Sequence, residues 1–172
     1  IPTNVISITD GQIFLESSLF FSGMRPAVNV GLSVSRVGGD AQTKAMKKAA
    51  GSLRIDLAQY REMEVFTQFS SDLDDATKEQ LEYGSGLMEL LKQPLGKPMS
   101  LADKVITLCA ARHKVMLGIP TAKVKGFQMD MLSYFASAHP EIAREIEETK
   151  DLSKELSQKI VEIAEEFKKS RC

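Results

Sequence analysis

Hydrophobic residues follow two different periods along this chain. Before about residue 40 they form short runs rich in β-branched residues, which predict strand pieces over residues 5–8, 12–15 and 28–37. The turn-forming residues 9–11 separate the first two pieces. Because a sheet usually has about five or six strands, we expect these pieces to belong to a larger sheet or to rely on a partner for their edges.

From Asp40 the period changes from two to about 3.6, which predicts α-helices. Gly51 lowers helix stability and predicts an irregularity in the first helical stretch. Phe66 and Phe69 widen the apolar face of this stretch, and we expect the helix to end near Ser70. Its stripe of small and apolar residues, at intervals of four, consists of Ala41, Ala45, Ala49, Leu53 and Leu57.

Residues 71–75, three of which are aspartates, combine turn-forming residues with possible N-cap residues. They predict the start of a helix that continues through Leu87 to about Leu91. On their own, these acids indicate only a solvated helix start. Prolines and a glycine within residues 94–98 then break the chain.

Two more helices follow this break. Ser100 with Asp103 resembles a capping box and predicts the start of a helix that extends to Met116. Residues 118–120, which include a glycine and a proline, end it. The next helix begins at about Thr121 and is interrupted at residues 139–140, where a proline follows a histidine.

The last segment is strongly amphipathic. Its apolar residues are spaced four, four, three and four apart, with charged residues on the other faces. Because this pattern covers little more than about two heptads, we favour a helix in a bundle over a coiled coil. The apolar residues are Leu152, Leu156, Ile160, Ile163 and Phe167.

Composition narrows the classes of function. The chain has 172 residues, of which 43% are hydrophobic and 26% are charged, so it is long enough for a sizeable core. A formal net charge of -1 argues against nucleic-acid binding through bulk positive charge. Cys109 and Cys172 do not make a disulfide framework, and we expect two free thiols in a reducing compartment. No apolar run approaches the roughly 20 residues that span a bilayer.

Several motifs of nucleotide and metal chemistry are missing from the sequence. A phosphate-binding loop needs a glycine-rich turn that ends in Gly-Lys-Ser or Gly-Lys-Thr, and neither Gly96-Lys97-Pro98 nor Gly84-Ser85-Gly86 meets this need. His113 and His139 are too isolated to predict a metal site, which takes three or four ligands. Ser33 and Ser35 show no nucleophile elbow, which argues against a hydrolase acting alone.

Arg36 is an isolated charge, and it gives the most specific hypothesis about function. It stands near the end of a β-prone run, just before Gly38 and Gly39, which can adopt φ > 0 and let the backbone turn sharply. Its planar, permanently charged fork suits carboxylates and phosphates. It could therefore pair with a local Asp or Glu, or act as an arginine finger on a phosphate held by a neighbouring subunit. The spacing alone leaves both readings open.

Ordered blocks of sequence carry a resemblance to a known family. Residues 8–16 read Ile-Thr-Asp-Gly-Gln-Ile-Phe-Leu-Glu, residues 57–62 read Leu-Ala-Gln-Tyr-Arg-Glu, and residues 25–36 read Arg-Pro-Ala-Val-Asn-Val-Gly-Leu-Ser-Val-Ser-Arg. With these blocks, and with residues 71–77 and 89–93, the whole chain resembles the last third of the α subunit of the rotary proton-translocating ATP synthase, in a bacterial-like form. It resembles α rather than the catalytic β subunit because residues 71–77 replace the acidic rotor-facing motif of β.

The resemblance implies a mainly α fold with two parts. Residues 1–40 would be the C-terminal strands of an α/β P-loop nucleotide-binding domain, whose phosphate loop lies in sequence before residue 1. Residues 41–172 would be an all-α bundle, in which the pattern predicts about five to seven helices. The sequence begins with Ile rather than Met, and we expect upstream sequence to be missing.

The resemblance also implies roles for individual residues. Arg36 would be an arginine finger for the catalytic site of the adjacent β subunit, with Ser7 and Val34 beside that site. For Ser7 and Val34, simple packing is an equally good reading. No metal ligand is expected.

A second, non-catalytic nucleotide site is implied as well, and only its adenine end would survive here. Arg25 and Pro26 would form one wall, and Gln93 would reach the base. The family often has a second glutamine two positions after the one that corresponds to Gln93, whereas this sequence has Leu95 there.

At the level of the complex, the resemblance implies a regulatory, non-catalytic subunit. Its partners would be β subunits in an α3β3 hexamer and the γ subunit of the central stalk, and it would lie on the cytoplasmic side of the cell membrane, reaching the membrane only through the proton channel. ATP or ADP with Mg²⁺ would be the cofactors in the intact complex. We expect the chain by itself to bind no nucleotide and to be inactive. The alternative is a free-standing helical interaction module in which Arg25 and Arg36 are structural.

Overall fold

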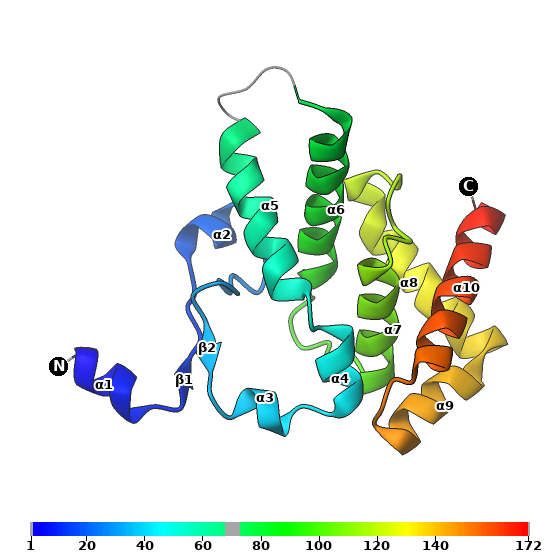
Figure 1. The fold of residues 1–172 in the computed structure, drawn as a ribbon, viewed down its shortest axis with the longest axis horizontal. Helices are drawn as coiled ribbons and strands as arrows, with labels where there is room; N and C mark the ends of the chain where they lie inside the picture. The colour runs from blue at the N-terminus through cyan, green and yellow to red at the C-terminus, as the bar shows by residue number, and fades with distance from the viewer. Residues whose placement is uncertain (1, 68–72, 172) are drawn as a thin grey trace.

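The computed structural model describes residues 2–67 and 73–171. Within this part the fold is mainly α-helical, as predicted, and an N-terminal segment extends away from one side of a helical bundle (Figure 1). The predicted end of a helix near Ser70, and the positions of Phe69 and Cys172, lie outside the described residues.

The N-terminal segment holds a small antiparallel sheet. Strand β1 pairs with β2 in the register Gly11 to Ser35 and Gln12 to Val34, and an isolated bridge joins Leu15 to Val28. The predicted strands over residues 12–15 and 28–37 are therefore present only in part. The elements in chain order are α1 (Pro2–Ile8), β1 (Gly11–Gln12), α2 (Ser17–Phe21), β2 (Val34–Ser35) and α3 (Gly38–Ala41).

Residues 5–8 are helical, so the strand predicted there is wrong. They belong to α1, and the N–H of Thr9 donates to the carbonyl oxygen of Val5 at 3.1 Å. A β-branched residue favours a strand mainly because it packs on a sheet. In the part of the chain that the structure describes, β1 pairs with β2 and Leu15 with Val28, and no strand pairs with residues 5–8, so local helical hydrogen bonds satisfy this backbone instead.

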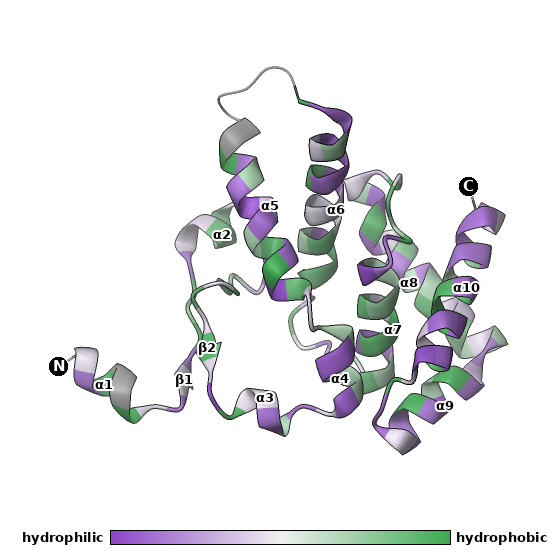
Figure 2. Ribbon diagram, viewed as in Figure 1, coloured by the Kyte–Doolittle hydropathy of each residue, from purple (hydrophilic) through white to green (hydrophobic). Residues whose placement is uncertain are grey.

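The bundle contains seven helices among the described residues, within the predicted range. Helix α7 lies at its centre and packs against α4, α8, α9 and α10, while α5 packs along α6. Figure 2 shows apolar residues over much of α7 and both kinds of residue on α10. The helices are α4 (Lys44–Ala49), α5 (Leu53–Thr67), α6 (Asp75–Leu91), α7 (Leu101–Arg112), α8 (Thr121–Ala138), α9 (Pro140–Thr149) and α10 (Lys154–Arg171).

The core lies inside this bundle. Its large side chains that are almost completely buried come from α7, α8, α9 and α10, and Ile160 belongs to the apolar stripe predicted for the last segment. They include Ile106, Met131, Phe135, Ile142, Ile146 and Ile160.

Two predicted helix starts are confirmed by their caps. The side chain of Asp74 accepts from the N–H of Thr77 at 3.0 Å, and Ser100 Oγ accepts from the N–H of Asp103 at 3.0 Å. Each cap satisfies one of the backbone donors that a helix start leaves unpaired.

Two predicted helices are shorter than expected. The stretch after Asp40 is divided, because Thr43 caps a new helix by accepting from the N–H of Met46 at 3.2 Å, and the chain turns again at Gly51, where an irregularity was predicted. Helix α7 ends at Arg112 instead of Met116. Lys114 has φ = 58°, a left-handed conformation that a helix cannot include.

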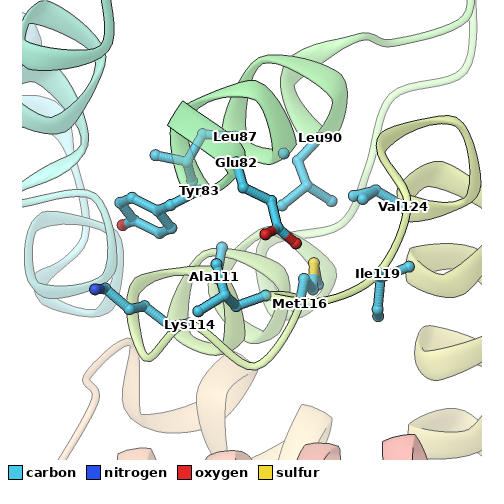
Figure 3. A pocket seen from close by; sticks show the side chains of 11 residues that line it. Glu82, Tyr83, Leu87, Leu90, Ala111, Lys114, Met116, Ile119 and Val124 are labelled. Atoms are coloured by element: carbon cyan, nitrogen blue, oxygen red, sulfur yellow. The ribbon is translucent and has the colours of Figure 1, made fainter. Parts of the chain in front are cut away.

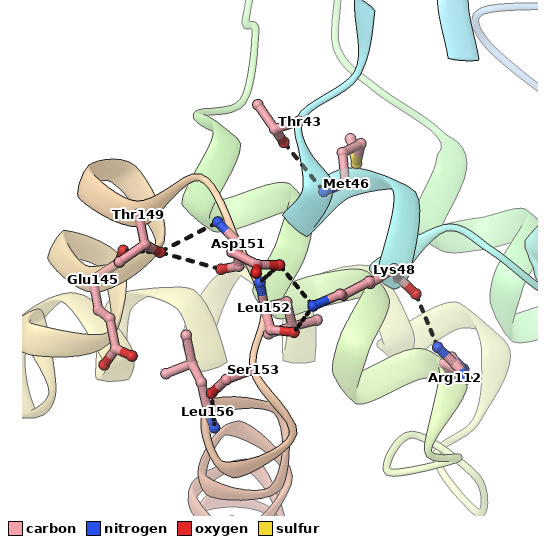
Figure 4. Close-up of polar contacts among 10 residues, drawn as sticks. All are labelled: Thr43, Met46, Lys48, Arg112, Glu145, Thr149, Asp151, Leu152, Ser153 and Leu156. Atoms are coloured by element: carbon pink, nitrogen blue, oxygen red, sulfur yellow. Dashed lines mark hydrogen bonds and ion pairs between the residues drawn. The ribbon is translucent and has the colours of Figure 1, made fainter. Parts of the chain in front are cut away.

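Polar contacts tie the first bundle helix to the loop before the last one (Figure 4). Lys48 Nζ donates to Asp151 Oδ1 at 2.7 Å and to the carbonyl oxygen of Leu152 at 2.9 Å. The hydrogen bond from Lys48 holds the pKa of the Asp151 carboxyl below its usual range. On the other side, Arg112 Nη1 donates to the carbonyl oxygen of Lys48 at 2.8 Å. Lys48 therefore joins α4, α7 and the start of α10.

Candidate functional site

Arg36 lies directly after β2 and before α3. Its backbone N–H donates to the carbonyl oxygen of Asp10 at 2.8 Å, which fixes this point of the chain against the residue before β1. The Arg36 residue is exposed, and its guanidinium has no hydrogen-bond or ion-pair partner among the described residues. A local Asp or Glu partner, the first reading of this arginine, is therefore not found in the described part of the chain.

Gly38 lets the side chain of Ser35 lie close to the backbone, and it does not make a left-handed turn. Among the glycines that the structure describes, positive φ occurs at Gly23, Gly96 and Gly118, so Gly38 and Gly39 do not use the φ > 0 that a glycine allows. A Cβ added to Gly38 would lie 2.3 Å from Ser35 Oγ, which accepts the Gly38 N–H at 2.8 Å. The serine and the glycine together shape the backbone on either side of Arg36.

The loop before β2 is held against α5 by a buried asparagine. Asn29 is 5% exposed, and its Nδ2 donates to Glu16 Oε1 at 2.6 Å. Asn29 Oδ1 accepts from Arg61 Nη1 at 2.9 Å and from the N–H of Leu32 at 3.0 Å. Glu16, Arg61 and the N–H of Leu32 thus satisfy the buried Asn29 side chain, and the contact with Arg61 fixes the loop to the bundle at this point.

A second arginine of α5 holds the same loop. Arg54 Nη2 donates to the carbonyl oxygens of Gly31 and Ser33, at 2.9 Å each. No pattern in the sequence predicted a role for Arg54 or Arg61. Arg61 stood out only as a member of the block at residues 57–62. Its contact with Asn29 could not be predicted, because the two residues are 32 positions apart and such a contact leaves no local pattern.

The other two residues expected near Arg36 are differently placed. Val34 lies in β2, two positions before Arg36, and is partly exposed. Ser7 lies in α1, where the structure describes its backbone alone.

A second candidate site is an open surface pocket of about 890 Å³. The structure brings Arg25, Pro26 and Gln93 together in its lining, although 67 residues separate Pro26 from Gln93 (93 minus 26). The N–H of Gln93 donates to the carbonyl oxygen of Arg25 at 2.9 Å, which joins the two segments directly. Arg36 and Val34 lie outside this lining.

Aromatic and polar groups define the inside of this outer pocket. The Arg25 guanidinium carbon lies 4.5 Å from the centre of the Phe20 ring, within the range of a cation–π contact. Gln93 Nε2 donates to the carbonyl oxygen of Lys97 at 2.9 Å, which leaves its side-chain oxygen available as an acceptor. Leu95 also lines the pocket and is fully exposed. Flat aromatic ligands with a donor group fit these features.

Lys125 holds the C-terminal end of α6, just before Gln93. Its Nζ donates to the carbonyl oxygens of Leu90 and Lys92, groups that a helix end leaves unpaired. Burial lowers the pKa of Lys125, while the nearby Glu89 carboxylate opposes this shift. Neither Phe20 nor Lys125 was expected from the sequence, because their roles depend on contacts between distant segments.

A smaller pocket between α6 and the turn after α7 is too tight for a cofactor. Figure 3 shows the Glu82 side chain extending from α6 toward Met116. Glu82 Oε1 accepts from the N–H of Gly118 at 2.6 Å, and the space that remains is about 20 Å³. A single water molecule needs nearly this much room.

The structure is thus a helical bundle preceded by a short piece of sheet, and an exposed arginine follows the second strand of this sheet. Residues 1–35 match the family described as "ATP synthase alpha/beta family, nucleotide-binding domain", and residues 42–167 match "ATP synthase alpha/beta chain, C terminal domain". The chain belongs to the ATP synthase alpha/beta family.

Bacterial relatives are similar over almost the whole chain. A protein of Clostridium kluyveri named ATP synthase subunit alpha is 56% identical over 169 residues, which are 98% of this chain and 34% of the relative. Proteins of the same name from Acetivibrio thermocellus and Petrotoga mobilis are 56% and 53% identical and overlap 98% and 97% of this chain, and 33% of each relative. The chain spans about a third of the length of these curated relatives.

Within the described residues, we find no helix with the length and apolar character needed to cross a membrane.

Proposed function

We propose that this chain forms the C-terminal part of a regulatory, non-catalytic α subunit of ATP synthase. In this proposal residues 1–40 complete a nucleotide-binding domain and residues 41–172 form the bundle. The subunit alternates with β subunits around the γ subunit of the central stalk and lies at the cytoplasmic side of the membrane. The complex couples ATP synthesis to proton transport, with ATP or ADP and Mg²⁺ as cofactors.

The observation that carries this proposal is the free guanidinium of Arg36. It is exposed and without a partner among the described residues, on a backbone held by Asp10, Asn29 and Arg54. An unpaired arginine on a fixed segment can reach across a subunit boundary at little conformational cost. In the assembled complex its fork stabilises the charge that develops on the transferred phosphoryl group in the neighbouring β subunit. Ser7 and Val34 line the same boundary.

The outer pocket supports a second role at the same subunit. Arg25 and Pro26 supply a flat wall for adenine, and Gln93 supplies an acceptor for its exocyclic amine. The phosphates bind to the loop that precedes residue 1 in the longer protein. Leu95, which stands where the family often has a second glutamine, offers the base an apolar contact only.

Steady-state ATP hydrolysis by the assembled complex tests the role of Arg36. We expect both Arg36→Ala and Arg36→Lys in the full-length subunit to lower turnover by about 10³-fold while nucleotide still binds, because lysine lacks the fork. Arg144→Ala is the control, since Arg144 is exposed on α9 and has no side-chain partner among the described residues. Near-normal turnover of an assembled Arg36 variant would refute the proposal.

A further inference from the structure

The half-buried side chain of Lys125 reaches from α8 to the end of α6. Its Nζ donates to the carbonyl oxygen of Leu90 at 3.2 Å and to that of Lys92. Among the described residues Lys125 makes no ion pair, and the nearby Glu89 carboxylate pairs with Lys92 instead. The charge of Lys125 is therefore directed at two carbonyl groups at the C-terminal end of α6, where the helix dipole favours a cation.

The peptide group between Lys92 and Gln93 is held at both ends. Its C=O accepts from Lys125, and its N–H donates to the carbonyl oxygen of Arg25 at 2.9 Å. A peptide group is planar and rigid, so two fixed ends determine its orientation. The charge-assisted hydrogen bond at the C=O also polarises this group and strengthens the hydrogen bond that its N–H donates. Lys125 thus supports the contact between Gln93 and Arg25 through a single peptide group.

This peptide group joins two sides of the outer pocket. Gln93 and Arg25 both line the pocket, together with Pro26 and Lys125 itself. The Gln93 side chain takes its orientation from a further hydrogen bond, in which Nε2 donates to the carbonyl oxygen of Lys97 at 2.9 Å. Because the Gln93 Cα follows the held peptide group directly, a rotation of that group would move the carboxamide relative to the wall formed by Arg25 and Pro26.

We propose that Lys125 is a positioning residue of the outer pocket, which acts through the peptide group before Gln93 to direct the Gln93 carboxamide toward a bound base. This role rests on the function proposed above for the pocket. Holding Gln93 in place before the base arrives lowers the entropy cost of binding. A helix of the bundle, α8, thereby takes part in a nucleotide site to which it contributes neither Arg25, Pro26 nor Gln93.

Hydrogen exchange at the Gln93 backbone amide, followed by NMR, tests the positioning without any nucleotide. In the 172-residue chain, Lys125→Met should increase the exchange rate of this amide about tenfold, because its peptide group loses a charge-assisted hydrogen bond. The amide of Met131, which is buried on the same helix as Lys125, should change much less. Equal acceleration at both amides would mean that Lys125 stabilises the bundle in general. That result, or unchanged exchange at Gln93, would overturn the proposal.

Retention of ATP at the non-catalytic site of the full-length subunit tests the consequence for binding. Gln93→Ala should weaken retention about fivefold, the equivalent of one net hydrogen bond, and Lys125→Met should weaken it about threefold. In the double variant, Lys125→Met should add no further loss, because the residue through which it acts is missing. Losses that multiply in the double variant would show that Lys125 acts independently of Gln93 and would overturn the proposal.

Two further variants separate the charge of Lys125 from unspecific effects. Lys125→Arg keeps a permanent cation with N–H donors, so exchange at Gln93 and retention of ATP should stay close to those of the unchanged protein. Lys123→Met on α8 removes an exposed lysine that does not line the outer pocket, and it should have no effect. A loss in either variant as large as that in Lys125→Met would contradict the proposal.

The same measurements distinguish a failure of this role from a failure of the pocket. Full retention of ATP in Gln93→Ala would refute the function proposed for the pocket, and with it the role of Lys125 in nucleotide binding. A loss in Gln93→Ala together with full retention in Lys125→Met would refute the role of Lys125 alone.

Discussion

Arg36 and Gln93 differ in how the protein holds their side chains. The Arg36 guanidinium is free within the described residues, whereas the Gln93 carboxamide donates one N–H to the carbonyl oxygen of Lys97 and keeps its oxygen and its second N–H for a ligand. Arg36 can therefore move to meet a phosphate, and Gln93 is oriented before any ligand arrives. Preorganisation of this kind lowers the entropy cost of binding.

We predict that Gln93→Ala in the intact subunit weakens nucleotide retention at the non-catalytic site by about 1 kcal/mol, the value of one net hydrogen bond. The nucleotide that remains bound after gel filtration measures this effect. ATP hydrolysis that depends on Arg36 should be largely unchanged. Gln158→Ala on α10 is the control, because Gln158 is exposed and contacts only Glu162 among the described residues. Full retention in Gln93→Ala would argue that Gln93 does not contact the base.

At the scale of the element, α5 and α6 pack unusually closely at one point. A Cβ added to Gly84 would lie 2.3 Å from a ring carbon of Tyr60, so the ring packs directly on the backbone of α6. Asp56 lies on α5 one turn before Tyr60, and its Oδ2 accepts from the hydroxyl of Tyr83, the residue before Gly84, at 3.1 Å. The glycine is costly for a helix but allows the two helices to approach.

We predict that Gly84→Ala lowers the free energy of unfolding by about 2 kcal/mol, because overpacking against Tyr60 outweighs the gain in helix propensity. Gly86→Ala is the matched control, since no atom lies within 4 Å of its added Cβ. It should raise the free energy of unfolding by about 0.5 to 1 kcal/mol. Urea denaturation measures both, and equal effects would contradict the close packing.

The junction between α4 and α10 gives a prediction about pH. The pKa of Asp151 is depressed in the folded protein, so its contact with Lys48 stabilises the fold above the unfolded pKa of about 4 and is lost as the pH falls through the lower folded value. Asp151→Asn should therefore be less stable than the unchanged chain at neutral pH. This difference in stability should become smaller as the pH falls. Thermal unfolding from pH 7 to pH 3 tests this.

Asp40→Asn is the control for this experiment. The Asp40 carboxylate is exposed and lies 3.9 Å from Lys47, a distance at which a surface ion pair contributes almost nothing. Its variant should have the same melting temperature as the unchanged chain. A constant difference between Asp151→Asn and the unchanged chain down to pH 3 would mean that the charge of Asp151 is not involved.

At the scale of the whole molecule, the two parts differ in what they bury. The core residues lie almost entirely in the bundle, while large apolar side chains of the N-terminal segment face solvent, among them Ile8 at 81% and Phe21 at 83% exposure. The segment is held mainly by β1, β2 and the polar contacts of Asn29 and Arg54. Local opening costs little where few apolar contacts are lost.

We predict that backbone amides exchange with solvent faster over residues 5–37 than over α7 and α10 in the 172-residue chain. Hydrogen exchange followed by mass spectrometry measures both regions in one sample, so the bundle serves as the internal control. Equally slow exchange in the two regions would mean that copies of the chain pair through the edges of the small sheet. That result would contradict the prediction.

Much of the bundle was predictable because its signals are local. Asp74 and Ser100 cap helix starts as predicted, since a cap acts within one turn. The apolar spacing before Phe167 predicts α10 correctly for the same reason. At residues 139–140 the sequence predicted only an interruption, whereas Pro140 begins α9. The predicted roles of Arg36 and Arg25 came from resemblance and stay predictions.

The sequence by itself determined the starts of α6, α7 and α8 and the buried face of the last helix. Only the tertiary structure decided that residues 5–8 are not a strand and that Gly38 leaves room for the side chain of Ser35. It also decided that Pro26 and Gln93 line the same pocket. A helix satisfies its hydrogen bonds within four residues, so local sequence specifies it. A strand, a pocket and a polar network need partners that are distant in sequence, and no local pattern specifies which partners will meet.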